Sequence, residues 1–206
     1  MTAQIDKLHT GLSRLAGLAM IALLGALLSG CGINNIPTFD EKAKASWSEV
    51  LNQYQRRADL IPNLVETVKG FAEQERKVLT DVVEARAKAT QTKLPDDILT
   101  NPEAFQKFQE AQSQLSGALG RLLVVVERYP DLKSNQNFLT LQSQLEGTEN
   151  RIAVARRDYI ESVRIYNTEI RTIPGRWWRA LLYPDSQPLE TFTVEPETTK
   201  LPKVKF

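Results

Sequence analysis

Histidine and cysteine are almost absent from this sequence. The single histidine is His9 and the single cysteine is Cys31, and both belong to the N-terminal region that precedes the bulk of the chain. If that region is a removable leader and Cys31 carries a lipid, the rest has no imidazole and no free thiol. These absences argue against histidine-based acid–base catalysis, cysteine nucleophiles, disulfide bonds and the usual zinc sites. We therefore expect no enzymatic activity, no catalytic residue, no metal and no cofactor.

A surplus of either charge is also missing. The chain has 26 Lys and Arg residues against 25 Asp and Glu, a formal net charge of +1. Domains that bind nucleic acid gather positive charge to neutralise phosphates, and this balanced composition supplies no such excess. We expect no nucleic-acid partner.

The one long apolar run lies near the N-terminus. A positive leader with Lys7 and Arg14 precedes residues 15–28. This run of about 14 residues matches the apolar region of a secretory signal and is shorter than the roughly 20 residues that span a bilayer. It ends in Leu-Ser-Gly-Cys, which resembles a bacterial lipobox. In a lipobox the cysteine, here Cys31, is acylated and the chain is cut before it.

An uncleaved signal anchor is the alternative to a lipoprotein. Counted as far as Ile33, the apolar stretch reaches about 19 residues and could just span a membrane. Either way, we expect the rest of the chain to lie outside the cytoplasm, tied to a membrane. Gly32 rather than aspartate follows Cys31, which favours the outer membrane, facing the periplasm, in a host that has one. Otherwise we expect the extracytoplasmic face of the plasma membrane.

Helical spacing of apolar residues dominates the remaining chain. A single heptad phase runs through residues 39–90 and is unchanged on the two sides of Pro62. We interpret the segment as one long helix, kinked near Pro62. The alternative is that the first helix folds back at Pro62, and the sequence does not settle which. Proline removes a backbone hydrogen bond, so the carbonyl of Ala58 needs another donor.

Two further long helices are predicted downstream. Asn101 is a typical N-cap for the first of them, which ends before Pro130, and the second runs from residue 134 or 135 to residue 173. Short connections make neighbouring helices antiparallel. The predicted fold is all-α: an antiparallel up-down helical bundle of three long helices, with a candidate short fourth helix at residues 176–182.

The predicted organisation has four parts. They are a lipoprotein signal peptide at 1–30, a membrane-proximal linker at 31–38, the helical bundle at 39–183 and an extended tail at 184–206.

Residues 56–70 carry the most distinctive motif. They read Arg-Arg-Ala-Asp-Leu-Ile-Pro-Asn-Leu-Val-Glu-Thr-Val-Lys-Gly, which resembles the signature segment of the LemA family. The resemblance continues through Leu-Glu-Gly-Thr-Glu-Asn-Arg-Ile at 145–152 and closes with Pro-Lys-Val-Lys-Phe at 202–206. It implies a membrane-anchored antiparallel helical bundle and brings no established biochemical activity.

Arg57 falls on the inward stripe of the first helix. A buried guanidinium must be paired, and a carboxylate is its best partner. The signature and the facing helix together form a candidate buried polar network. Its members are Arg56, Arg57, Asp59, Pro62, Asn63, Glu66, Glu146, Glu149 and Asp158. The network either fixes the register of the bundle or lines a polar pocket for a ligand or partner.

Trp177 and Trp178 stand between two arginines near the end of the chain. Such residues either contact a membrane or a partner, or cap the end of the bundle.

Two functions remain open. The first is a non-enzymatic, lipid-anchored scaffold or adaptor that binds another envelope protein. The alternative is an accessory component that binds a small ligand for an envelope enzyme or transporter. The sequence leaves the oligomeric state open.

Overall fold

The computed structural model describes residues 20, 32–91 and 94–193. The predicted signal peptide, apart from residue 20, lies outside the described residues, and so do Cys31 and the closing residues 202–206. The chain forms two compact units. The first comprises Met1–Thr38 and Thr168–Ser186, and the second comprises Phe39–Asn167 and Gln187–Phe206.

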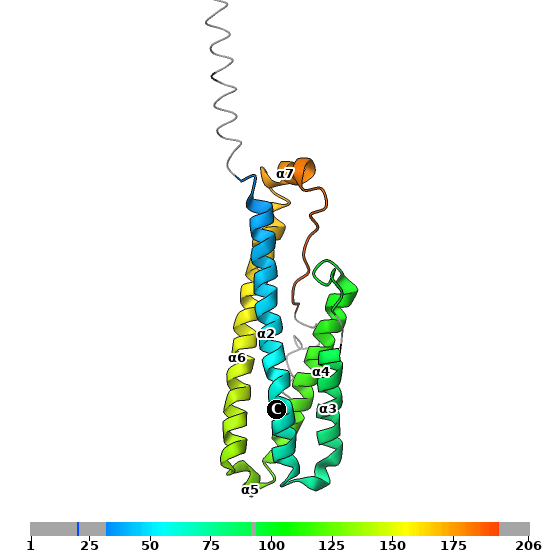
Figure 1. The fold of residues 1–206 in the computed structure, drawn as a ribbon, viewed down its shortest axis with the longest axis vertical. Coiled ribbons are helices and arrows are strands. Elements are labelled where there is room, and N and C mark those ends of the chain that lie inside the picture. The colour runs from blue at the N-terminus through cyan, green and yellow to red at the C-terminus, as the bar shows by residue number, and fades with distance from the viewer. Residues whose placement is uncertain (1–19, 21–31, 92–93, 194–206) are drawn as a thin grey trace, which may run out of the picture. The chain divides into compact units, whose positions relative to one another are not determined.

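All regular structure in the described residues is helical, which confirms the predicted all-α class (Figure 1). The helices are α2 (Asn35–Lys69), the short 3₁₀ helix η1 (Glu73–Glu75), α3 (Arg76–Gln91), α4 (Pro102–Val126), α5 (Pro130–Lys133), α6 (Gln136–Glu169) and α7 (Gly175–Leu182). None of these helices is long and apolar enough to cross a membrane.

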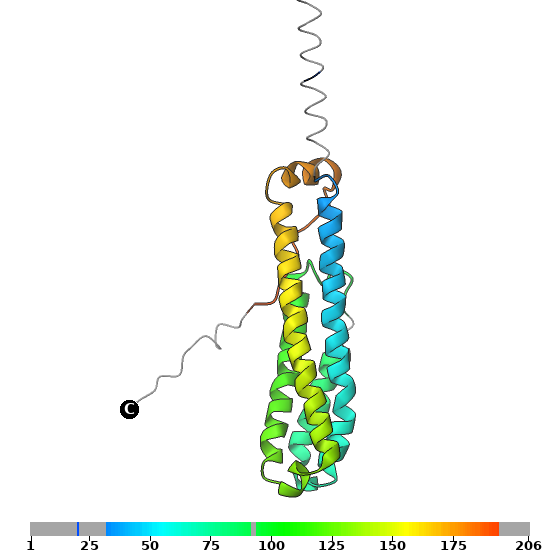
Figure 2. The same ribbon diagram turned by 90° about the vertical axis from the view of Figure 1, so that its left-hand side faces the viewer.

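The second unit is a bundle of four helices. Figures 1 and 2 show α2, α3, α4 and α6 side by side, with successive helices running in opposite directions. Antiparallel packing of consecutive helices therefore holds, but the number of long helices is four and not three. The difference arises in the first predicted helix.

The single helix predicted over residues 39–90 is wrong. Helix α2 ends at Lys69, and the chain reverses through Gly70 and η1 into α3. Glycine is a poor helix former because it loses the most backbone freedom on folding. The heptad phase continues past the turn because α3 packs its apolar face on the same core as α2. That core contains Ile61, Leu64, Val68, Ala72, Leu79, Val82, Ala85, Leu115, Leu122 and Phe138.

Continuity through Pro62 is confirmed, since this residue lies inside α2. Asn101 is the N-cap of α4, and its side chain accepts a hydrogen bond from the Ala104 amide at 3.1 Å. At the start of α6, the Asn135 side chain accepts from the Phe138 amide at 3.1 Å. Short polar side chains satisfy the first free amides of a helix in this way.

A cluster of aromatic rings forms a second part of the core in this unit. Trp47 lies 5.2–6.1 Å, between ring centroids, from Phe105, Phe108, Tyr159 and Phe192. Phe192 belongs to the segment that follows α7, and it is buried. Aromatic packing thus fixes the described end of the predicted tail on the bundle.

Hydrogen bonds hold the same segment. The Tyr159 hydroxyl donates to the Glu190 carbonyl at 2.7 Å, and the Glu190 amide donates to the Leu99 carbonyl at 2.7 Å. The Asn167 side chain bonds both backbone groups of Leu189, each at 2.9 Å. Residues 187–193 therefore belong to the bundle and bring Thr193 to the site described next.

Candidate functional site

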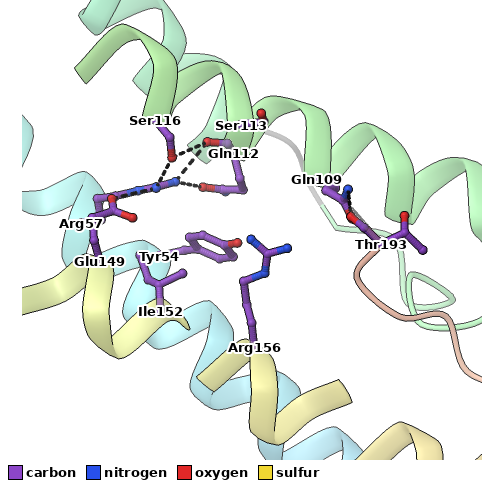
Figure 3. A pocket seen from close by; sticks show the side chains of 10 residues that line it. All are labelled: Tyr54, Arg57, Gln109, Gln112, Ser113, Ser116, Glu149, Ile152, Arg156 and Thr193. Atoms are coloured by element: carbon purple, nitrogen blue, oxygen red, sulfur yellow. Dashed lines mark hydrogen bonds and ion pairs between the residues drawn. The ribbon is translucent and has the colours of Figure 1, made fainter. Parts of the chain in front are cut away.

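Arg57 is the largest fully buried side chain of the described residues, with 1% of its surface exposed. It points from α2 toward α4 and α6. Its Nη1 donates to Ser116 Oγ at 2.7 Å and to Glu149 Oε1 at 3.0 Å. Its Nη2 donates to Gln112 Oε1 at 2.6 Å and to the Gln112 carbonyl at 3.3 Å. One guanidinium therefore joins three helices (Figure 3).

The carboxylate of this network is less buried than the cation. The Glu149 side chain is 41% exposed, so water can solvate it in part. Gln112, in contrast, is buried and uses its own amide nitrogen to bond the Ala89 carbonyl of α3 at 3.3 Å. The most desolvated partner of Arg57 is thus a neutral amide.

Arg86 of α3 supplies the donor that the proline in α2 makes necessary. Its Nε donates to the Ala58 carbonyl at 2.8 Å, the group whose helical partner would be the amide of residue 62. The proline ring itself is exposed. The carbonyl released by Pro62 is satisfied by a side chain from the neighbouring helix.

A pocket of about 390 Å³ opens beside this network. Its walls come from α2, α4, α6 and the end of the described tail, and Figure 3 shows its lining residues. They are Tyr54, Arg57, Gln109, Gln112, Ser113, Ser116, Glu149, Ile152, Arg156 and Thr193. The Gln109 side chain donates to the Thr193 carbonyl at 3.0 Å, which joins the tail to α4 at the rim.

Two cations and one carboxylate face this pocket. The guanidinium carbon of Arg156 lies 4.3 Å from the centroid of the Phe192 ring, and that of Arg57 lies 5.0 Å from the Tyr54 ring. Burial raises the pKa of the Tyr54 hydroxyl, and the nearby Arg156 charge opposes that shift. The hydroxyl is therefore neutral at physiological pH and can both donate and accept a hydrogen bond.

The structure pairs Arg57 with Glu149 and leaves the other predicted network residues on the surface. Those exposed residues are Arg56, Asp59, Pro62, Asn63, Glu66, Glu146 and Asp158. The acidic ones have partners on their own helices, as in the bond from Gln142 to Glu146 at 2.9 Å.

Gln112, Ser116 and Arg86 were not among the predicted site residues. Gln112 interrupts the apolar stripe of the second predicted helix, and this is a signal that sequence reasoning could have used, as is the need of the Ala58 carbonyl for a donor. Polar groups at such a position need a partner.

Helix α7 of the first unit carries an exposed apolar surface. Trp177 is 61% exposed and Leu181, one turn further on, is 72% exposed. Trp178 is half-buried, and its indole N–H has no hydrogen-bond partner among the described residues. The short helix predicted at 176–182 is confirmed, with Gly175 as its first residue.

Close packing fixes the start of α7. A Cβ atom at Gly175 would overlap the Glu169 carbonyl, so only glycine fits there. The Glu169 side chain accepts a hydrogen bond from Asn35 at 3.1 Å. A Cβ at Gly32 would lie 3.9 Å from Pro174, which places the residue after Cys31 beside the start of α7.

No group of three or more Cys, His, Asp or Glu side chains in the described ranges could hold a metal ion.

A model of the LemA family matches residues 46–206. The chain belongs to the LemA family. The LemA match covers both the Arg57 network and α7, and all regular secondary structure in its described part is helical.

Curated relatives of this LemA-family chain carry the name of a magnetosome protein. "Magnetosome protein MamQ 2" and "Magnetosome protein MamQ 1" of Paramagnetospirillum magneticum are each 27% identical to it over 176 residues. Each alignment covers 78% of this chain and 64% of the relative. "Magnetosome protein MamQ" of Magnetospirillum gryphiswaldense is 26% identical over 173 residues, which cover 76% and 63%. The chain thus spans less than two thirds of these relatives.

Proposed function

We propose that this protein is a non-enzymatic, lipid-anchored envelope protein that serves as a scaffold or adaptor for another envelope protein. Membership of the LemA family and similarity to proteins named for the magnetosome support a membrane-associated role. The names of these relatives state a location and no reaction. The anchor is the acylated Cys31, at the outer membrane of a host that has one.

The exposed apolar surface of α7 carries the proposal. Apolar patches on a water-facing surface mark interaction sites, and tryptophan and arginine dominate the binding energy of protein interfaces. α7 presents Trp177 and Leu181, with Arg176 exposed next to them. This combination favours a groove on a partner protein.

The position of α7 in its unit indicates which partners can reach it. Gly32 is adjacent to Pro174, so a lipid on Cys31 would hold α7 near the membrane. A partner embedded in or anchored to the same membrane would meet this surface first. Two helical turns offer little apolar area to a bilayer, and the acyl chains already provide stable anchoring. We therefore favour a protein partner over the lipid surface.

The test is photo-crosslinking in intact cells. A photoreactive amino acid replaces Trp177 in one strain and Val124 in another. Val124 is the matched control because it is an apolar residue of α4 with 72% exposure, comparable to that of Trp177. We expect one defined protein crosslinked from position 177 and not from position 124. Crosslinks to lipid alone, or the same products from both positions, would refute the adaptor function of α7.

The anchor has its own test. Metabolic labelling with a fatty acid analogue should mark the wild-type chain, and Cys31→Ser should abolish the label. Equal labelling of both chains, or labelling of neither, would show that Cys31 is not the lipid attachment site.

The pocket beside Arg57 supports a second candidate function, the binding of a small ligand for an envelope enzyme or transporter. Its volume of about 390 Å³ lies within the usual range for ligand sites. The charges of its lining residues decide what kind of ligand would fit.

A further inference from the structure

The pocket beside Arg57 contains a cation with no carboxylate partner among the residues that the structure describes. None of the ion pairs formed within the described residues includes Arg156. Its guanidinium packs on the Phe192 ring and, in Figure 3, reaches across the pocket toward the Tyr54 hydroxyl. Arg57, by contrast, is paired with Glu149 at 3.0 Å. The described lining residues of the pocket therefore carry one positive charge in excess.

Glu149 limits how much negative charge a ligand can carry. One of its oxygens accepts from Arg57, and its side chain is open to solvent. A dianion such as a phosphate monoester would be repelled by this carboxylate as well as attracted by the guanidinium. A single carboxylate suits one guanidinium better, because the two groups can form a pair of parallel hydrogen bonds.

The remaining lining residues indicate the polarity of the rest of the ligand. Ile152 and the Tyr54 ring are buried apolar surfaces at the pocket. Gln109 and Ser113 of α4 add polar groups at the wall. The second oxygen of Glu149 is an acceptor, which fits a hydroxyl or ammonium donor on the ligand.

We propose that this pocket binds a small organic molecule with one carboxylate and one hydrogen-bond donor. Arg156 pairs with the carboxylate, Glu149 accepts from the hydroxyl or ammonium group, and Ile152 and Tyr54 contact the carbon skeleton. Arg57 positions Glu149 and does not need to touch the ligand. The site lies in the second unit, and it does not depend on the binding of a partner at α7.

The test measures binding to the full acylated chain in detergent by titration calorimetry. The probes are lactate, 4-aminobutyrate and 3-phenylpropionate, each compared with its primary amide, which lacks the carboxylate charge, and glycerol phosphate as a dianion. We expect at least one of the first two to bind and to bind more tightly than its amide and than glycerol phosphate. If neither lactate nor 4-aminobutyrate binds more tightly than its amide, or if 3-phenylpropionate or glycerol phosphate binds best, the proposal is wrong.

Two matched pairs of variants locate the site. Arg156→Gln should weaken binding about tenfold or more, since it removes a charge-assisted pair. Arg157→Gln, the exposed neighbour on α6, should leave it unchanged. Equal affinity of these two variants would overturn the role of Arg156.

The second pair protects the test against a folding defect. Ser113→Phe fills the pocket and leaves every charge in place, so it should abolish binding. Gln114→Phe adds the same ring at the next exposed position of α4, outside the pocket, and should bind normally. Binding that survives Ser113→Phe with unchanged affinity would place the ligand elsewhere.

Discussion

Replacement of Arg57 by alanine should destabilise the bundle through its neutral partners more than through its carboxylate. The guanidinium is 1% exposed and the Glu149 side chain 41% exposed. Once the cation is removed, water can solvate Glu149. Water cannot solvate Gln112 in the same way, because this residue is only 6% exposed. Its Oε1 atom loses the donor that Arg57 supplied.

The expected loss of unfolding free energy in Arg57→Ala follows from these contacts. An unsatisfied buried amide oxygen costs about 1–3 kcal/mol. The buried stem of Arg57 contributes about 0.8 kcal/mol for each CH₂ group that is lost. Release of a buried charge into water offsets part of the total. We expect Arg57→Ala to lower the free energy of unfolding by about 2–4 kcal/mol, below the roughly 3–5 kcal/mol typical of breaking a fully buried ion pair.

Two further variants separate the contributions. Arg57→Met keeps most of the apolar stem and removes only the hydrogen bonds, so it should cost about 1–3 kcal/mol. Removal of Glu149 leaves the buried guanidinium without its carboxylate but with its bonds to Gln112 and Ser116, so Glu149→Ala should cost about 1–3 kcal/mol. Urea unfolding followed by circular dichroism measures all three. If Arg57→Ala unfolds like the wild type, or if Arg57→Met costs more than Arg57→Ala, the reasoning is refuted.

Three other substitutions test the fold. Pro62→Ala restores an amide donor to the Ala58 carbonyl and should keep or raise the melting temperature; a marked loss would mean that the proline itself stabilises α2. Gly175→Ala should cost about 1–3 kcal/mol through overlap with the Glu169 carbonyl, seen as faster amide exchange in α7, and unchanged exchange would contradict it. Burial raises the pKa of Tyr159, so stability should fall as pH rises above its usual value of 10.0, and Tyr159→Phe should flatten that fall in alkaline urea titrations.

Much of the fold could be predicted because the signals that set it are local. Asn101 was expected to cap a helix from its own chemistry and from the proline that follows, and it does so. The reversal at Gly70 could not be predicted from periodicity. Two helices that pack on the same core share one apolar pattern, so the heptad phase did not reveal the turn between them.

The candidate site was less accessible to sequence reasoning. Burial of Arg57 followed from the helical stripe, and Glu149 stood among three acidic candidates on the facing helix. The choice between those three depends on the register of α6 against α2, which no local pattern sets. The approach of Thr193 and Phe192 depends on hydrogen bonds from distant residues such as Tyr159. The leader and Cys31 lie outside the described residues, and the lipid anchor stays a prediction.

Pro62 and the reversal at Gly70 are linked through Arg86. Proline releases the Ala58 carbonyl, and Arg86, 28 residues further along, supplies the missing donor at 2.8 Å. In one continuous helix, these two residues would be about 42 Å apart at 1.5 Å per residue. The bond exists only because α3 folds back along α2. The same reversal brings the Ala89 carbonyl to Gln112, which in turn accepts from Arg57. The bonds made by Arg57, Arg86 and Gln112 thus join α2, α3 and α4 at the pocket wall, and they depend on the reversal after α2.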